Sequence, residues 1–203
     1  MTATRRTFGT AAAVLLGVGL GVGPAGSAPD AQAAVPAAAP TAAPTSTQAS
    51  TCSGAKRPGR VVVVRGMPAT TRSAARALLA SGVRCDARAL TKRAARDKTR
   101  LSFGIVTAEE FFALPEKETK YRYLVDALAK ARPGYEKVSR DYVWPRVAAG
   151  DGYKDPAAWD EAVAAGLLTK DQAARMRRDG SGYLGWRIGV SDRGEWDFFI
   201  AGD

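Results

Sequence analysis

Residues 186–200 read WRIGVSDRGEWDFFI and have the pattern of a β-hairpin. Two apolar runs flank the loop Asp192-Arg193-Gly194, in which glycine can adopt the left-handed conformation that ends a three-residue turn. A two-residue loop at Arg193-Gly194 would set Val190 opposite Asp197, whereas the longer loop keeps large apolar residues opposite one another. The sequence therefore predicts the cross-strand pairs Val190–Trp196, Ile188–Phe198 and Trp186–Ile200.

The other face of this hairpin carries carboxylates near the turn. A pair of carboxylates can supply the acid and the base or nucleophile of glycoside hydrolysis. Asp192, Glu195 and Asp197 are therefore the candidate catalytic residues. The alternative is that they are only the polar positions of a half-exposed strand beside a turn.

The remaining segments predict an α+β fold. Residues 60–65 contain four consecutive valines between glycines, which is typical of a buried strand, and residues 101–106 are a second strand candidate. Helices are expected from Thr70 or Thr71 to about Ser81, over residues 118–131, and after the caps Asp155 and Thr169. We expect a small antiparallel or mixed sheet, with the C-terminal hairpin packed against several helices.

The positive charge of the chain is concentrated in one segment. Residues 56–100 contain 13 Lys or Arg against two Asp, a net charge of +11, whereas residues 101–203 contain 15 against 17, a net charge of −2. Such a local field favours polyanions: wall polymers, anionic lipid surfaces or nucleic acid. If residues 84–100 are helical, basic residues spaced four apart form one ridge. The predicted binding residues are Arg72, Arg76, Arg84, Arg88, Lys92, Arg96 and Arg100; the alternative is a solvated face without a partner.

Cys52 and Cys85 are the only cysteines, and such an even pair predicts a disulfide if the domain is exported. Closing a loop of this length is worth about 3 to 4 kcal/mol in the chain-entropy treatment.

The first 33 residues predict a cleavable export signal. Arg5 and Arg6 precede an apolar run over residues 8–23, and Ala31-Gln32-Ala33 suits a signal peptidase. The segment Thr4-Arg5-Arg6-Thr7-Phe8 resembles a twin-arginine signal, with Gly9 and Thr10 in place of the usual Leu and Lys, which leaves the Sec route open. We expect a secreted or envelope protein with no transmembrane segment once the leader is removed.

Residues 34–50 consist almost wholly of Ala, Pro, Thr, Ser and Gln, a composition that predicts a disordered tether because it cannot bury enough apolar surface to fold. Residues 51–203 are expected to form a single globular domain.

The chain contains no histidine, which excludes His-dependent triads and the common zinc sites. No metal and no cofactor are predicted. The preferred function is a secreted, non-enzymatic binding module that engages an anionic partner through the basic segment. The alternatives are a carboxylate-dependent hydrolase of cell-wall glycans and a protein-interaction or inhibitor module.

Overall fold

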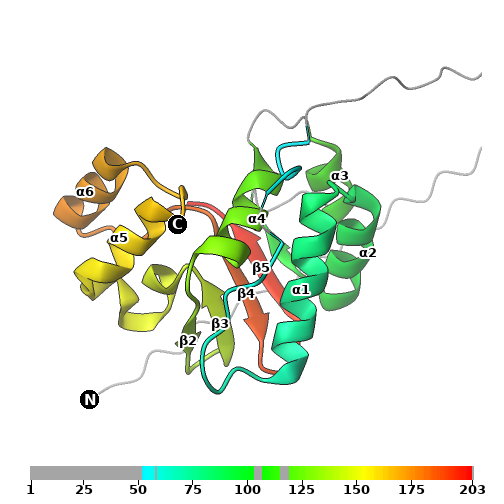
Figure 1. Ribbon diagram of the computed structural model, residues 1–203, viewed down its shortest axis with the longest axis horizontal. Helices are drawn as coiled ribbons and strands as arrows, with labels where there is room; N and C mark the ends of the chain where they lie inside the picture. Colours follow the sequence, from blue (N-terminus) through cyan, green and yellow to red (C-terminus); the bar gives the residue numbers. More distant parts are fainter. Residues whose placement is uncertain (1–51, 58, 103–106, 115–118, 203) are drawn as a thin grey trace, which may run out of the picture. The chain divides into compact units, whose positions relative to one another are not determined.

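Five strands form a mixed sheet in the order β1-β5-β4-β3-β2 in the computed structural model, which describes residues 52–57, 59–102, 107–114 and 119–202 (Figure 1). Strand β1 runs parallel to β5, and the other neighbours are antiparallel. The predicted leader 1–33 and tether 34–50 lie outside the described residues. The strands are β1 (Arg100–Leu101), β2 (Gly134–Glu136), β3 (Asp141–Trp144), β4 (Arg187–Ser191) and β5 (Trp196–Ile200).

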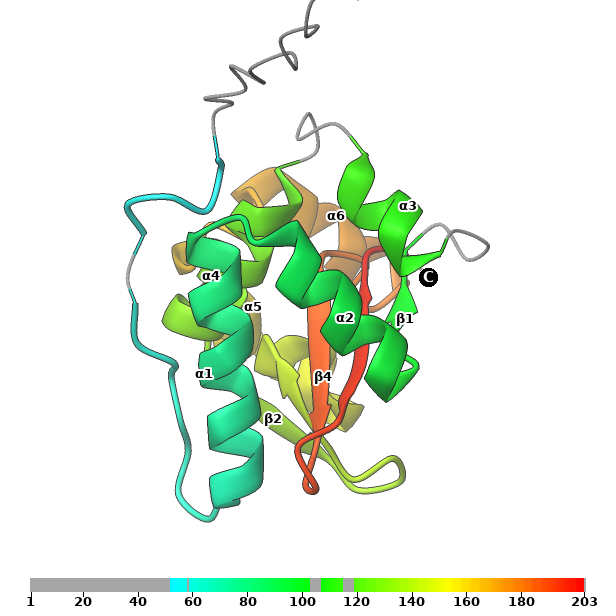
Figure 2. The same ribbon diagram turned by 90° about the vertical axis from the view of Figure 1, so that its right-hand side faces the viewer.

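Helices lie on both sides of this sheet, so the α+β prediction is confirmed. Figure 1 shows α1 to α4 on one side and α5 and α6 on the other, and Figure 2 shows α1 and α2 side by side. None of the described helices is long and apolar enough to cross a bilayer. The helices are α1 (Ala69–Val83), α2 (Ala87–Asp97), α3 (Ala108–Ala113), α4 (Lys120–Lys130), α5 (Pro156–Ala164) and α6 (Lys170–Asp179), with short 3₁₀ turns η2 (Arg146–Ala148) and η3 (Gly150–Lys154) between β3 and α5.

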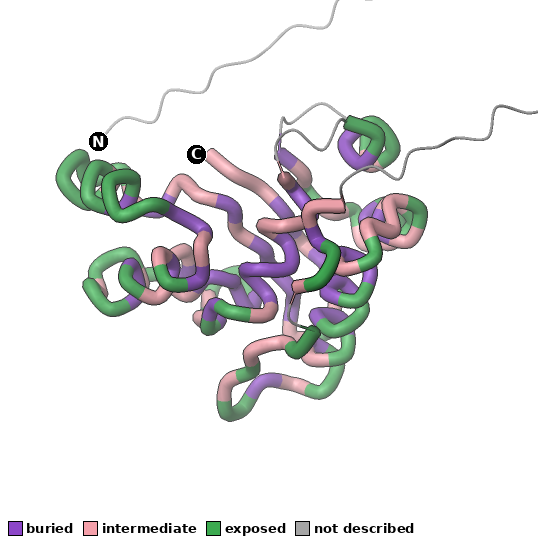
Figure 3. The backbone as a smooth tube through the Cα atoms, turned by 45° about the horizontal axis from the view of Figure 1, so that its top comes forward, coloured by how far each residue is buried: buried purple, intermediate pink, exposed green. Residues whose placement is uncertain are grey.

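The main core lies between the sheet and helices α1 to α4. Trp144, Trp196 and Phe199 from the strands pack there with Leu124 and Leu128 of α4. Val143 and Phe198 belong to a smaller cluster, and α5 and α6 enclose another. The burial pattern in Figure 3 places buried backbone at the centre and exposed backbone on the outer helix faces.

The hairpin turn follows the prediction, but its register changes one residue later. Ser191 N donates to Glu195 O across the three-residue loop, and Gly194 has a φ of +88°. Val190 pairs with Trp196 as predicted, whereas Gly189 pairs with Phe198, so Asp197 is the extra residue of a β-bulge. The predicted pairs Ile188–Phe198 and Trp186–Ile200 are therefore wrong; the observed partners are Ile188–Phe199 and Arg187–Ile200.

The bulge lets Trp196 and Phe199, which are three residues apart, face the same side of the sheet. Phe199 is fully buried in the main core, and Phe198 lies over Gly189 on the other face. A Cβ at Gly189 would lie 2.2 Å from the Phe198 ring, so this position requires glycine. In a regular strand residues two apart share a face, so Phe198 and not Phe199 would join Trp196 in the main core.

The Val-rich segment is not a strand, and the prediction for residues 60–65 is wrong. Val62 N donates to Leu128 O at 2.9 Å, and Trp144 Nε1 donates to Val62 O at 3.3 Å. Leu128 is in the last turn of α4, where the carbonyls receive no hydrogen bond from an amide of the same helix. The segment therefore crosses the end of a helix, and Val61 and Val64 pack against the core without joining the sheet.

Helix α1 is longer than the sequence predicted at both ends. Pro68 stands at the N-cap, and Thr70 and Thr71 donate instead to the carbonyls of Asp192 and Ser191, each at 2.8 Å. The helix continues through Gly82, which lies against Leu124 and Val125 of α4. The absence of a side chain there permits close helix packing, so this glycine does not end the helix.

Candidate functional site

Helix α2 turns one face to the core and the other to solvent. Asp86 caps its first turn by accepting from Ala89 N at 2.9 Å, and Leu90 and Ala94 are buried four residues apart. The intervening positions therefore face outward. The helix covers only Ala87–Asp97, so Arg84 lies just beyond α1 and Arg100 lies on β1.

The structure places most of the predicted binding residues at the surface. Arg72 is half-buried on α1; the other six are exposed, namely Arg76, Arg84, Arg88, Lys92, Arg96 and Arg100. Arg88, Lys92 and Arg96 follow one another along α2, and we call these three residues the α2 ridge. Exposed cations along one face form a local positive field.

Carboxylates near this segment pair with only some of its cations. Arg96 Nε lies 2.7 Å from Asp97 Oδ1, and Arg84 lies 3.8 Å from Asp86. Within the described part of the chain, Arg76, Arg88 and Lys92 have no carboxylate in ion-pair contact. These three side chains are thus available to an external anion.

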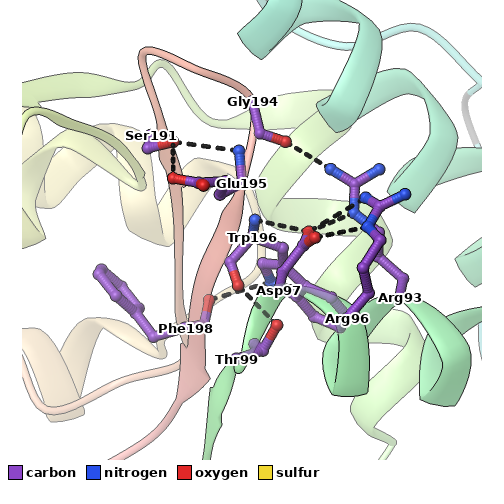
Figure 4. Close-up of polar contacts among 9 residues, drawn as sticks. All are labelled: Arg93, Arg96, Asp97, Thr99, Ser191, Gly194, Glu195, Trp196 and Phe198. Carbon is purple, nitrogen blue, oxygen red and sulfur yellow. Dashed lines mark hydrogen bonds and ion pairs between the residues drawn. The ribbon is translucent and has the colours of Figure 1, made fainter.

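Asp97 anchors the end of α2 to the start of β5. It accepts from Trp196 N at 2.9 Å and pairs with both Arg93 and Arg96 (Figure 4). Burial opposes ionisation of Asp97, but the hydrogen bonds from Arg96, Trp196 N and Arg93 together lower its pKa. Thr99 Oγ1 completes this anchor by donating to Trp196 O at 2.5 Å.

Grooves flank α2 on both sides. One, of 360 Å³, lies between α1 and α2; the other, of 470 Å³, lies between α2 and α3. Lys92 lines both grooves. Both volumes fall within the roughly 300–1,000 Å³ typical of small-molecule sites.

A second candidate site is the carboxyl pair formed by Asp197 and Asp141. Burial, a hydrogen bond to the Asp141 carboxyl, and the charges of Asp141 and Glu195 raise the pKa of Asp197 to about 7, with Arg100 opposing them. Asp141 is 1% exposed, and its Oδ1 has no hydrogen-bond partner among the described residues. The carboxyl of Asp197 therefore holds its proton up to a much higher pH than an ordinary aspartate.

The other two hairpin carboxylates make local contacts. Asp192 pairs with Arg140 through Nη2 at 2.5 Å and Nε at 2.8 Å. Glu195 Oε2 accepts from Arg193 at 2.9 Å and from Ser191 Oγ at 3.4 Å, while Ser191 Oγ accepts from Glu195 N (Figure 4). The structure thus brings Glu195 and Asp197 into one charge cluster, and Asp192 faces Arg140.

Sequence reasoning missed Asp141 and Asp97. Asp141 pairs with Ser191 across β3 and β4, which sets it beside the hairpin turn although it is distant in the chain. No local pattern marks such a contact, because its partner comes from another strand. The described residues hold no group of three or more Cys, Asp or Glu arranged to bind a metal ion.

The predicted disulfide joins Cys52 to Cys85, with their Cα atoms 5.8 Å apart, and is confirmed. It ties the N-terminal segment to the junction between α1 and α2, immediately before the α2 ridge.

The chain matches no protein-family model, no curated protein and no solved structure at a significant level.

Proposed function

We propose that this protein is an exported, non-enzymatic binding module that engages an anionic partner through the basic residues of α1 and α2. The observation that carries the proposal is that Arg76, Arg88 and Lys92 are exposed and have no carboxylate in ion-pair contact within the described part of the chain. Like charges four apart cost a helix a few tenths of a kcal/mol per pair. An anion bound along α2 would offset that cost.

The charge distribution supports an extended partner. Residues 56–100 carry a net charge of +11, so the field around α1 and α2 attracts anions over more than a single contact. The predicted export signal places the partner in the envelope or outside the cell. Wall polymers, anionic lipid surfaces and nucleic acid offer the required repeated negative charge.

Charge reversal on two surfaces tests this function. The triple variant Arg76→Glu, Arg88→Glu, Lys92→Glu alters the proposed surface; the matched control reverses three exposed arginines of α6, Arg175, Arg177 and Arg178. Both variants change the net charge equally. Binding of the full chain to polyphosphate, duplex DNA and phosphatidylglycerol vesicles would be measured at 0.05 and 0.5 M salt.

We expect binding that weakens steeply with salt, because exposed charges are screened within about 10 Å at 0.1 M. It should be lost in the α1–α2 variant and kept in the α6 control. Equal loss in both variants would mean that only net charge matters. No binding to any of the three probes would overturn the proposal.

A hydrolase is the second candidate, because Asp197 has a pKa of about 7 and is poised as a general acid at neutral pH. A glycosidase needs its two carboxyls roughly 5 Å or more apart, which a hydrogen-bonded pair does not satisfy, so Glu195 is the better second group than Asp141. Asp197→Asn and Glu195→Gln, each checked for an intact fold, would abolish turnover of a cell-wall glycan. Turnover that persists in both variants would exclude these carboxylates.

A further inference from the structure

We propose that the groove between α1 and α2 binds one phosphate-bearing lipid with a single acyl chain, whose chain lies along the groove and whose phosphate contacts Lys92 and Arg96. This inference rests on the proposed anion-binding function and names its ligand.

The groove has an apolar floor between two helices. Leu78 of α1 and Leu90 of α2 lie beneath it and are at most 2% exposed, so the exposed Ala77 and the half-buried Ala89 supply its accessible apolar surface. Its volume is 360 Å³, which lies within the roughly 300–1,000 Å³ range of small-molecule sites. Each methylene that such a groove buries contributes about 0.8 kcal/mol, so an acyl chain gains affinity that a purely charged polymer cannot.

Cations line one wall of this groove, and all of them come from α2. They are Lys92, Arg93 and Arg96, and the eight described lining residues include no carboxylate. Arg93 is held by Asp97 and by Gly194 O, and Arg96 is oriented by Asp97. Of these three cations, Lys92 is exposed and has no carboxylate in ion-pair contact among the described residues.

Two other grooves show why this one suits an anion. The groove between α2 and α3 includes Glu109, and the one between α5 and α6 includes Asp160. Only the α1–α2 groove, of these three, combines an apolar floor with cations alone.

The test titrates the full chain with lysophosphatidic acid below its micelle concentration, at constant salt. Inorganic phosphate supplies the head without the chain, and lysophosphatidylcholine supplies the chain with a neutral head. The variants Ala77→Leu and Ala89→Leu fill the groove with a good helix former and leave every cation in place. The matched control is Ala174→Leu, which fills the α5–α6 groove instead. Comparing variants of one chain cancels any contribution from residues 1–51.

We expect lysophosphatidic acid to bind at least about tenfold more tightly than inorganic phosphate or lysophosphatidylcholine, a difference of about 1.4 kcal/mol. Ala77→Leu or Ala89→Leu should lower that affinity by about tenfold and leave polyphosphate binding unchanged, and Ala174→Leu should have no effect. Lys92→Glu should weaken the binding of both lysophosphatidic acid and polyphosphate.

Binding of inorganic phosphate as tight as that of the lipid would overturn the inference, as would lipid binding that the groove-filling variants do not alter. If the chain binds anionic vesicles but not monomeric lysophosphatidic acid, the surface recognises a bilayer, and the inference is also overturned. If polyphosphate binds and the lipid does not, this inference fails alone. If neither binds, the proposed function fails with it.

Discussion

Asp197 has no partner on β4, because it is the extra residue of the bulge in β5. A bulge re-aims the side chain it contains, and here it sets the Asp197 carboxyl beside that of Asp141. Burial and the neighbouring negative charge make ionisation costly at this position. In a regular strand Asp197 would be an ordinary polar position; here it is the hairpin carboxyl whose pKa is raised.

This perturbation predicts how stability depends on pH. The pKa of Asp197 is raised to about 7 in the folded state, above the value near 3.9 of an unfolded chain. The folded state therefore binds the proton more tightly, and this contribution is complete below about pH 4 and is lost as pH rises to 7. Asp197→Asn removes the penalty, so we expect the variant to be more stable than the parent at pH 8 by roughly 1–2 kcal/mol after solvent screening.

Urea unfolding of the parent and of Asp197→Asn at pH 5 and pH 8 measures this effect. Asp151→Asn, at an exposed position on η3, is the control and should behave like the parent at both pH values. If the difference in stability between Asp197→Asn and the parent does not grow with pH, the raised pKa of Asp197 is contradicted.

At the scale of the element, α2 depends on contacts outside itself. Its own signals are a good N-cap and an amphipathic pattern, but its C-terminal end is held by β5 through Asp97. Arg93 adds a second link by donating to Gly194 O at 2.5 Å. Helix α2 is thus fixed to the sheet by Asp97 and Arg93, which lie within the basic segment 56–100 of the sequence.

Replacing Asp97 by Asn tests this anchor. The amide keeps a hydrogen-bond acceptor for Trp196 N but leaves the partly buried Arg93 without its counter-ion. Hydrogen bonds to charged groups contribute about 1.5–3 kcal/mol, so we expect a loss of that size in the free energy of unfolding at pH 7. Because the folded state lowers the pKa of Asp97, the parent loses this stabilisation on acidification and the variant does not.

Urea unfolding midpoints at pH 7 and pH 3 measure the loss. Asp179→Asn, at the exposed end of α6, serves as the control and should change stability by less than about 0.5 kcal/mol. An Asp97→Asn variant as stable as the parent at pH 7 would show that the anchor contributes nothing.

The Val-rich segment shows how an element can be misjudged from its composition. Four consecutive valines suit a strand, but Val62 uses its amide on a carbonyl of α4 and its own carbonyl on Trp144. Both of its backbone groups are therefore satisfied without a neighbouring strand. β-Propensity describes the conformation of a residue and does not identify its hydrogen-bonding partner.

At the scale of the whole molecule, the N-terminal segment closes over α1 and α4. Cys52 is bonded to Cys85, Ser53 Oγ accepts from Arg122 N at 2.9 Å, and Arg57 Nη1 donates to both carboxylate oxygens of buried Asp126. A segment without helix or strand is thereby held by three long-range links. Of these links, the disulfide is the one that reaches the α1–α2 junction next to the α2 ridge.

The double variant Cys52→Ala, Cys85→Ala tests the covalent link. With a sequence separation of 33, the chain-entropy treatment predicts a loss of about 3–4 kcal/mol. For a domain of this size the melting temperature should fall by about 10 °C. Calorimetry of the parent, the double variant and the parent with reductant measures it. A reduced parent as stable as the oxidised one would show that the noncovalent links suffice.

Features that depend on neighbouring residues could be predicted from the sequence alone: the helix caps at Asp155 and Thr169, the three-residue turn of the hairpin, and the cysteine pair. Their hydrogen bonds and backbone angles arise within a few residues, or from two cysteines that have no other partner. The sequence also determined where positive charge gathers along the chain.

The other features depend on contacts that form only in the folded chain. The bulge at Asp197 depends on burying Trp196 and Phe199 on the same face of the sheet, and the raised pKa of Asp197 depends on a carboxyl from another strand. The exposure of the α2 ridge depends on which face of the helix the sheet covers. Each outcome is set by contacts between residues distant in the chain. The free energy of such contacts cannot be predicted from the pattern of neighbouring side chains.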